Sequence, residues 1–536
     1  MGRHGERPVY NIAGEELTND TPGRRPAGCP VSGAGAAADK IKFRFGRLFD
    51  RYDGMAEALV ELGATMKADP PVKTLPPSEE APDDSNIPAG YTYLGQFIAH
   101  EITFDKTRLL DVPADPPEGY RSPSLDLDSL YGCGPSDEKD SEMYRDGGEF
   151  KLGPVVQASS FNAIDRWNDL PRKKKEPAEP GKPARYEAVI GDERNDENLP
   201  LAQTHLAFLK FHNRVVKYLR DNPGKQDAGK SLFEQARETV VRHFQHIVLH
   251  DFLPRVLDAG VLKAVLGGDR RCKALSDVGS KDELFMPVEF SGAAFRFGHS
   301  MVRPSYDYNH FQKGDPRFPT NSRPATLESF FTFTQFSGDL DGLQGLDNRW
   351  VIDWRRFYDF GPLSSVTFNK AKKIDTNFDL RLERIKGYPH NVSDDKYKAI
   401  TARNLVRGYV LKLPTGQTVA KALGETPMTA GMITSMASDE QFAVLTDCAY
   451  KFHVRTPLWF YVLKEAELFG GGNRLGPVGS RVVAETFYCI IRHSDYSVIT
   501  APLSDAEMLP GREARKFDMA DLLSCLGGDV NPTRSD

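Results

Sequence analysis

The chain has 536 residues, of which 40% are hydrophobic, 27% charged and 10% aromatic, an ordinary composition for a soluble globular protein. This length allows one large domain or several smaller ones around a large buried core. The formal net charge of −6 gives no support for binding to nucleic acid or to an anionic membrane.

The first residues, Met-Gly-Arg-His-Gly-Glu-Arg-Pro, contain no apolar run of signal-peptide length, and no stretch of about 18 apolar residues predicts a transmembrane helix. Gly2 lacks the following Ser or Thr that a myristoylation signal needs. We therefore expect a cytoplasmic protein, and leaderless secretion stays open. The six cysteines are scattered without a Cys-x-x-Cys pair, which argues against a zinc site and leaves room for one or two disulfides.

Residues 1–40 are rich in Gly, Pro, Ala and Arg and predict a flexible N-terminal arm. We expect one catalytic domain over 41–510 and a C-terminal tail over 511–536. Apolar residues at helical spacing predict long helices, and strand-like alternation is short, as around 286–297. The expected fold is mainly α, a single large domain with few short strands and long loops. The helices are expected at 199–219, 230–257, 396–410, 437–447 and 456–468. Asn195 or Asp196 is the expected cap of the first of these.

The segment 91–104 reads Tyr-Thr-Tyr-Leu-Gly-Gln-Phe-Ile-Ala-His-Glu-Ile-Thr-Phe. On a helix, Gln96 and His100 lie four residues apart and share a face, while Glu101 points about 100° away. One face can therefore present an amide and an imidazole to a cavity. Taken alone, His100 is more typical of a histidine satisfied within a core.

Oxygen-bearing side chains alternate through 122–132, Ser-Pro-Ser-Leu-Asp-Leu-Asp-Ser-Leu-Tyr-Gly. Ser122, Ser124, Asp126 and Asp128 offer no nitrogen or sulfur donor, a pattern that suits a hard cation such as Ca²⁺. The segment lacks the Gly and terminal Glu of an EF-hand loop. A capped turn before a helix is the alternative.

Three further segments combine arginine with other polar groups. Arg194 and Glu197 lie three apart at a helix start, where an exposed ion pair is the alternative. Ala294-Phe295-Arg296-Phe297-Gly298-His299-Ser300 places a glycine beside a histidine, which permits close approach of backbone or cofactor. Asn404 and Arg407 can share one helical face.

These five segments, in this order and within roughly 43–490, resemble the animal-type haem peroxidases of the peroxidase–cyclooxygenase superfamily, here as a bacterial-type member without a signal peptide. The resemblance implies a haem enzyme that reduces H₂O₂ and oxidises a small organic or halide substrate through a ferryl intermediate. It implies His100 as distal histidine, Gln96 as its amide partner and Arg194 as distal arginine. It also implies three proximal roles: His299 ligates the haem iron, Arg296 pairs with a haem propionate, and Asn404, in the segment with Arg407, bonds the far nitrogen of His299.

The resemblance further implies a calcium site with Ser122, Ser124, Asp126 and Asp128 as ligands, joined by Glu101 where the family usually has Asp. Mammalian members attach haem through an Asp and a Glu, and here Ala99 replaces the Asp while Glu197 retains the second position. Asn198 replaces the methionine that forms a sulfonium link in myeloperoxidase. We therefore expect haem b, held without a covalent bond or by one ester through Glu197.

Two alternatives remain. A fatty-acid dioxygenase of the same superfamily needs a tyrosine three residues before the proximal histidine, where this chain has Arg296. A non-catalytic haem- or calcium-binding adhesion protein would need none of the distal residues. The helix containing His243, His246 and His250 could suggest a separate metal site, and an ordinary core helix is the simpler interpretation.

Overall fold

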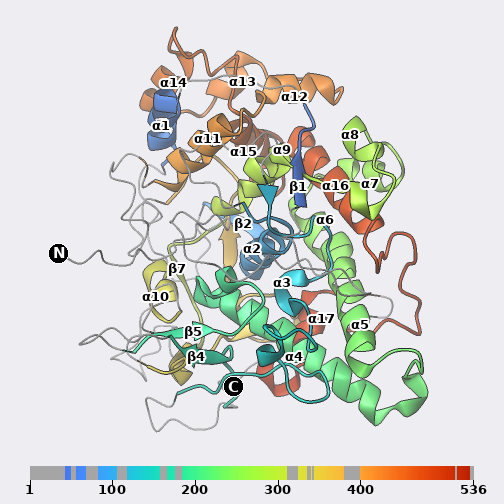
Figure 1. Ribbon diagram of the computed structural model, residues 1–536. Helices are drawn as coiled ribbons and strands as arrows, with labels where there is room; N and C mark the ends of the chain where they lie inside the picture. Colours follow the sequence, from blue (N-terminus) through green and yellow to red (C-terminus); the bar gives the residue numbers. More distant parts are fainter. Residues whose placement is uncertain are drawn as a thin grey trace, which may run out of the picture.

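The computed structural model describes residues 43–49, 56–67, 82–105, 118–156, 166–175, 184–310, 324–334, 340, 343–379, 397, 399–513 and 516–530. Within these ranges the fold is mainly α, as predicted, with a few short strands and long connections (Figure 1). The N-terminal arm expected over 1–40 lies outside the described residues.

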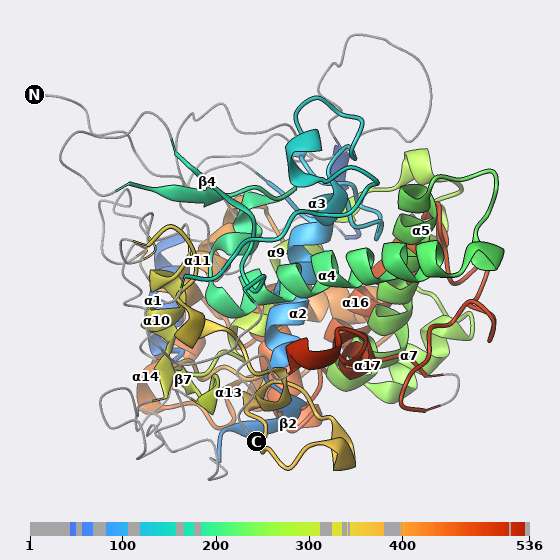
Figure 2. The same cartoon turned by 90° about the horizontal axis from the view of Figure 1, so that it is seen from below.

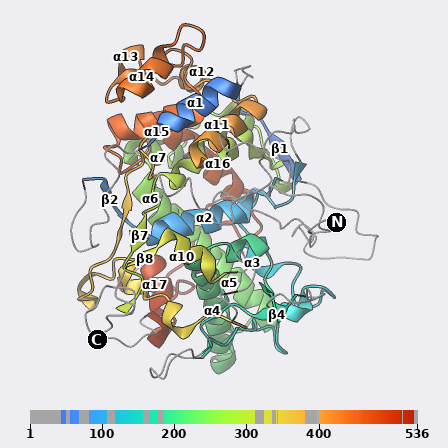
Figure 3. The same cartoon turned by 90° about the vertical axis from the view of Figure 1, so that its left-hand side faces the viewer.

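Helix α2 (Gly90–Ile102) lies near the centre of the molecule in all three views (Figures 1, 2 and 3). Eleven of its thirteen residues are buried, including polar residues such as Gln96, His100 and Glu101. A helix that is buried on every side must satisfy its polar side chains inside the protein. These side chains therefore mark functional or structural sites rather than a solvated face.

Helices α4 (Leu199–Asp221) and α5 (Leu232–Ile247) pack against each other and form the end of the molecule that carries α3 (Figure 3). Asn198 caps α4 by accepting from the N–H of Leu201, so the expected caps Asn195 and Asp196 were wrong by a few residues. Those two residues instead belong to the preceding 3₁₀ turn η2 (Glu193–Asp196). Ser231 and Glu234 form a capping box at the start of α5.

The helix predicted over 230–257 is interrupted by a π-helical turn. Helix α5 passes into η4 (Val248–Phe252), a π-helix, and then into α6 (Leu253–Val256). The π-turn carries Asp251 and Phe252 toward α2: Asp251 accepts from the hydroxyl of Tyr91, and Phe252 lies against Gly95. Isolated π-turns inside α-helices are frequent at functional sites.

The strands form four small sheets. β1 (Phe43–Gly46) pairs antiparallel with β3 (Glu118–Gly119) and parallel with β6 (Met286–Pro287). The other sheets are the pairs β2 (Asp84–Pro88) with β9 (Lys370–Lys372), β4 (Arg172–Lys174) with β5 (Tyr186–Ala188), and β7 (Ser305–Tyr306) with β8 (Ala325–Thr326). The strand expected over 286–297 ends at Pro287, because α9 (Val288–Gly292) and the 3₁₀ segment η6 (Ala294–His299) bury apolar residues on several sides.

The opposite end of the molecule is helical, with α1 (Ala56–Thr65) against α11 (Ile400–Val410) and α14 (Asp439–Thr446) (Figure 3). Helix α15 (Leu458–Phe469) packs on α11, α16 and η6. The remaining helices are α3 (Asp128–Tyr131), α7 (Ala259–Leu266), α8 (Lys273–Ser276), α9, α10 (Leu327–Thr332), α12 (Gly416–Ala422), α13 (Ala430–Thr434), α16 (Pro477–Arg492) and α17 (Met519–Ser524). The remaining 3₁₀ turns are η1 (Ser141–Met143), η3 (Pro223–Lys225), η5 (Lys281–Glu283), η9 (Asn348–Trp350), η10 (Trp354–Arg356), η11 (Gly361–Leu363) and η14 (Gly527–Val530).

The expected C-terminal tail contributes to the core, since Met519, Leu522 and Leu523 of α17 are buried and Phe517 packs on Phe211. Among the described residues, no helix is both long and apolar enough to cross a bilayer. Cys133 is disulfide-bonded, and the described free cysteines are Cys272, Cys448, Cys489 and Cys525.

Candidate haem site and cation site

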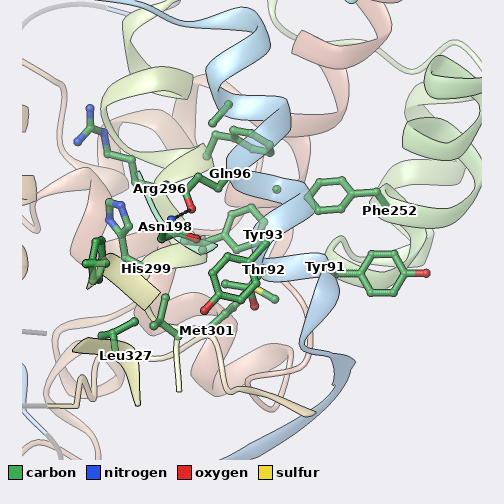
Figure 4. A pocket seen from close by; sticks show the side chains of 17 residues that line it. Tyr91, Thr92, Tyr93, Gln96, Asn198, Phe252, Arg296, His299, Met301 and Leu327 are labelled. Atoms are coloured by element: carbon green, nitrogen blue, oxygen red, sulfur yellow. Dashed lines mark hydrogen bonds between the residues drawn. The ribbon is translucent and has the colours of Figure 1, made fainter. Parts of the chain in front are cut away.

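A small cavity of about 40 Å³ lies between α2 and η6. Its lining is largely apolar, as in pockets that bind organic molecules. Figure 4 shows polar side chains of both segments around it, with Gln96 and Asn198 near its centre and His299 and Arg296 at one side. Its lining residues are Tyr91, Thr92, Tyr93, Gly95, Gln96, Ala99, Asn198, Phe252, Phe295, Arg296, Phe297, Gly298, His299, Met301, Val302, Leu327 and Phe331.

Gly298, the residue before His299, borders open space. A Cβ atom added at the neighbouring Gly298 would meet no heavy atom within 4 Å. A planar group could therefore approach the imidazole closely, as the sequence suggested for this glycine. An apolar cavity with a histidine in its wall fits haem, which proteins hold by an axial histidine within an apolar pocket.

Asn404 of α11 contacts His299 as expected, and the structure defines the polarity of this contact. The amide oxygen of Asn404 accepts from Nη1 of Arg296 at 2.9 Å, so its Nδ2 faces Nδ1 of His299 at 2.8 Å and also donates to the carbonyl of Ile400. Nδ1 of His299 therefore accepts, and in a neutral imidazole the hydrogen resides on Nε2. Arg296 also donates to the carbonyl of Ser291. The pair Arg296–Asn404 thus sets the tautomer of His299.

His100 lies on α2, and a buried chain of hydrogen bonds through Asn195 and His205 sets its tautomer. Nδ2 of Asn195 faces Nδ1 of His205 at 3.0 Å, which leaves Oδ1 of Asn195 to accept from Nδ1 of His100 at 2.9 Å. Nε2 of His100 then carries the lone pair, and it has no hydrogen-bond partner. Burial, assisted by the positive charge of Arg194, lowers the pKa of His100 to about 3, so the ring is neutral at neutral pH. His100 is therefore a neutral base with its accepting nitrogen available.

The structure places Arg194 away from the cavity. Its guanidinium pairs with both carboxylate oxygens of Asp192 and donates to the carbonyls of His100 at 2.8 Å and Thr103 at 2.9 Å. These carbonyls belong to the last turn of α2, whose end leaves carbonyls without helical partners. Neither Arg194 nor His100 is among the described residues that line the cavity. In this structure Arg194 closes the end of the helix that carries His100.

Gln96 joins the cavity to the segment after η2. Its Nε2 donates to Glu197 at 2.9 Å, and its Oε1 accepts from Nδ2 of Asn198 at 3.0 Å, the bond drawn in Figure 4. Burial raises the pKa of Glu197 well above its ordinary value, which favours a neutral carboxyl group, and its second oxygen has no partner. Ala99 lines the cavity and offers only a methyl group, which cannot form an ester.

Three buried carboxylates, Glu101, Asp126 and Asp128, form the cluster predicted as a calcium site. Each contributes an oxygen to a group whose members lie within 4.8 Å of one another. Glu101 also accepts from the N–H groups of Asp128 and Ser129, at 2.9 and 3.0 Å, and so fastens α3 to α2. Oδ1 of Asp126 and Oγ of Ser124 are buried without a hydrogen-bond partner.

The charge of this cluster suits a cation. Burial raises the pKa of all three carboxyl groups, that of Asp128 to about 8. Arg121 approaches Asp128 at 3.4 Å, and Lys281 approaches Asp126 at 3.7 Å, so the positive side chains stand at the edge of the cluster. Oxygen donors alone are the ligand set of a hard cation, and a divalent ion would satisfy the orphaned oxygens.

The structure thus brings most predicted residues together but separates some. Arg407, on α11, pairs with Asp105 just beyond α2 and does not line the cavity described here. The sequence interpretation missed Asp192, Asn195 and His205. Their signals were weak: a carboxylate two residues before Arg194, and one of the two histidines in helix α4.

Residues 119–347 match the family model described as animal haem peroxidase. A peroxidase-like protein of Margaritifera margaritifera is 36% identical over 135 residues, which are 25% of this chain and 16% of that protein. Heme peroxidase 2 of Caenorhabditis elegans is 26% identical over 211 residues, 39% of this chain and 26% of the relative. This chain thus spans about a quarter or less of the length of these curated relatives.

Two solved structures share the fold over most of the chain. Peroxidase A from Dictyostelium discoideum has a TM-score of 0.60 at 17% identity and covers 92% of this chain and 94% of its own. Fatty acid alpha-dioxygenase from Oryza sativa has a TM-score of 0.57 at 11% identity and covers 92% of this chain and 82% of its own. At these identities the likeness concerns the fold alone.

Proposed function

We propose that this chain is a haem-dependent peroxidase, because residues 119–347 match the animal haem peroxidase family model. It would reduce H₂O₂ and oxidise a small organic or halide substrate. The observation that carries the proposal is the cavity between two histidine-bearing segments, η6 with Gly298 and His299 in the cavity wall and α2 with the neutral base His100.

Haem in this cavity would supply the redox-active iron on which the peroxide bond breaks. His299 would hold the iron through Nε2, which requires the ring hydrogen on Nδ1 and an accepting oxygen on Asn404. In this structure that oxygen accepts from Arg296. We therefore propose that Arg296 leaves Asn404 for a haem propionate, which lets the amide turn its oxygen toward His299.

His100 would perform the proton transfers. Its Nε2 takes the proton of the bound peroxide and returns it to the leaving oxygen, work that typically contributes about 10²–10⁴ in rate. Asn195 and His205 hold the ring so that Nδ1 donates and Nε2 accepts. Gln96, oriented by Glu197 and Asn198, is a polar side chain of this helix that lines the cavity.

We propose Arg194 as a positioning residue rather than a group that touches peroxide. Its bonds to the carbonyls of His100 and Thr103 fix the end of α2. The proposed Ca²⁺ at Glu101, Asp126 and Asp128 acts on the same helix end, because Glu101 follows His100 directly. Both devices would hold the distal base in place.

We propose that the haem is haem b, held without a covalent bond or by one ester through Glu197. The neutral, half-satisfied carboxyl group of Glu197 supports this second option. Acid–acetone extraction distinguishes the two, since an ester-linked haem stays with the protein.

The decisive experiment uses purified protein loaded with haem and mixed with stoichiometric peroxide. The wild-type Soret band is expected to shift rapidly. His100→Gln should retain haem and react about 10²–10⁴ times more slowly, whereas His299→Ala should lose haem. Equal rates for wild type and His100→Gln would overturn the assignment of the base.

A fatty-acid dioxygenase is the second candidate, supported by the shared fold. The position three residues before His299 holds Arg296, and Tyr306 is buried with its hydroxyl accepting from the N–H of Arg303 at 2.9 Å. Neither arrangement offers a tyrosyl group next to His299. Consumption of O₂ with a fatty acid, without peroxide, would reverse this preference.

A further inference from the structure

Two histidines face each other on the outer side of the α5–η4 helix. His246 is the penultimate residue of α5, and His250 lies within the π-turn η4. Their rings are 4.5 Å apart between centroids, with an angle of 46° between the ring planes. His246 is half-buried and His250 is exposed. No hydrogen bond or ion pair involves either ring in the described part of the chain, so their nitrogens are available.

The third histidine of this helix is excluded from the pair. His243 is buried, its Nδ1 bonds the carbonyl of Thr239 at 2.7 Å, and its Nε2 accepts from the N–H of Leu509 at 3.0 Å. Both of its nitrogens are therefore engaged. Of the three histidines in this helix, His243 is therefore structural, and His246 and His250 form a pair without hydrogen-bond partners among the described residues.

The geometry of the pair matches a chelate. Histidines four residues apart on one helical face are a recurrent pair of metal ligands. Each metal–nitrogen bond is about 2.0–2.1 Å, so the two ligand nitrogens must lie within about 4 Å of each other. The two tilted rings, with centroids 4.5 Å apart, are close enough for side-chain rotation to bring one nitrogen of each onto a shared ion.

We propose that His246 and His250 form a binding site for a divalent transition metal ion, separate from the haem cavity and from the carboxylate cluster. Imidazole nitrogens suit Cu²⁺, Ni²⁺ and Zn²⁺, and the order of affinity places Cu²⁺ first. The carboxylates described in this structure form no ion pair with either ring, so water completes the coordination. The metal site does not depend on haem, so its test is independent of the test of the proposed peroxidase function.

The test is a Ni²⁺ titration by calorimetry on the full-length protein, in buffer saturated with Ca²⁺ to fill the carboxylate cluster. The wild-type protein should bind one Ni²⁺ at this site. His246→Gln and His250→Gln should each weaken binding at least roughly tenfold, since a chelate loses one of its two ligands. His493→Gln is the matched control, because His493 is a half-buried histidine without a histidine partner among the described residues.

Cu²⁺ electron paramagnetic resonance gives a second readout, in which the wild-type spectrum should show coupling to two nitrogens and each single variant should show one. Wild-type Ni²⁺ affinity in the double variant His246→Gln/His250→Gln would overturn the proposal. A loss of Ni²⁺ affinity in His493→Gln equal to that in His246→Gln would also overturn it. Haem-loaded and haem-free protein should give the same Ni²⁺ affinity, and a large difference would contradict the independence of the two sites.

Discussion

Removal of Ca²⁺ should make the stability of this protein fall as the pH rises. The carboxyl group of Asp128 has an ordinary pKa of 3.8, and burial raises it to about 8, with Asp126 adding to the effect and Arg121 opposing it. A group whose folded pKa lies above its unfolded pKa binds its proton more tightly in the folded chain. Its contribution is complete below about pH 4 and is lost as the pH rises through about 8.

The difference between these two pKa values corresponds to about 6 kcal/mol at 1.36 kcal/mol per pKa unit. An unfolding entropy of about 2.1 cal/mol/K per residue gives roughly 1.1 kcal/mol/K for a chain of this length. Without Ca²⁺, the melting temperature should therefore drop by about 5 °C between pH 4 and pH 8. Bound Ca²⁺ neutralises the carboxylates, so the drop should disappear or reverse.

Differential scanning calorimetry at several pH values, with excess Ca²⁺ or with a chelator, measures this effect. Asp128→Asn should reduce the pH-dependent drop without abolishing it, because burial also raises the pKa of Glu101 and of Asp126, and it should weaken the stabilisation by Ca²⁺. Glu138→Gln is the control, because it removes an exposed carboxylate from the same region. The reasoning fails if the melting curves with and without Ca²⁺ show the same dependence on pH.

Three further predictions concern the haem site. Arg194→Ala should destabilise the protein by about 1–3 kcal/mol, because two buried carbonyls lose their donor, while Asp192 keeps its ion pair with Arg121; an unchanged melting temperature would contradict this role. Gly298→Val should leave the melting temperature of the haem-free protein unchanged. It should weaken haem binding about 5- to 150-fold, which corresponds to an overpacking cost of ~1–3 kcal/mol. Equal haem affinity of variant and wild type in a titration would show that haem binds elsewhere. Asn195→Leu should leave the imidazoles of His100 and His205 without their hydrogen-bond partner and destabilise the protein by about 1–3 kcal/mol for each. It should also slow the reaction with peroxide in stopped flow. An unchanged rate would show that Asn195 does not orient His100 for proton transfer.

Much of the architecture could be predicted from periodicity. The helices α4, α11 and α15 occupy nearly the predicted ranges, because each buries an apolar face that repeats every three to four residues. The region after Pro287 was misjudged as strand-like, because short helical turns can bury alternate residues just as a strand does. Periodicity cannot distinguish such short segments.

Side-chain partners could not be predicted in the same way. The sequence indicated that Asn404 would meet His299, and the structure contains that contact at 2.8 Å. It could not show that Arg296 takes the amide oxygen, since that depends on three segments meeting in space. The partner of Arg194 stands only two residues away, yet the choice between Asp192 and the cavity depends on where the end of α2 lies.

The π-turn η4 constrains the number of residues in this segment as well as their identity. A π-turn has hydrogen bonds that span five residues instead of four, so it accommodates more residues per turn than an α-helix. Deleting one residue between Val248 and Phe252 would restore a regular α-helix and rotate the residues on one side of it by about 100° relative to the other. Phe252 would then leave the cavity, and Asp251 would lose the hydroxyl of Tyr91. In relatives of this chain, insertions and deletions should therefore be rarer within this turn than in the loops on either side of it.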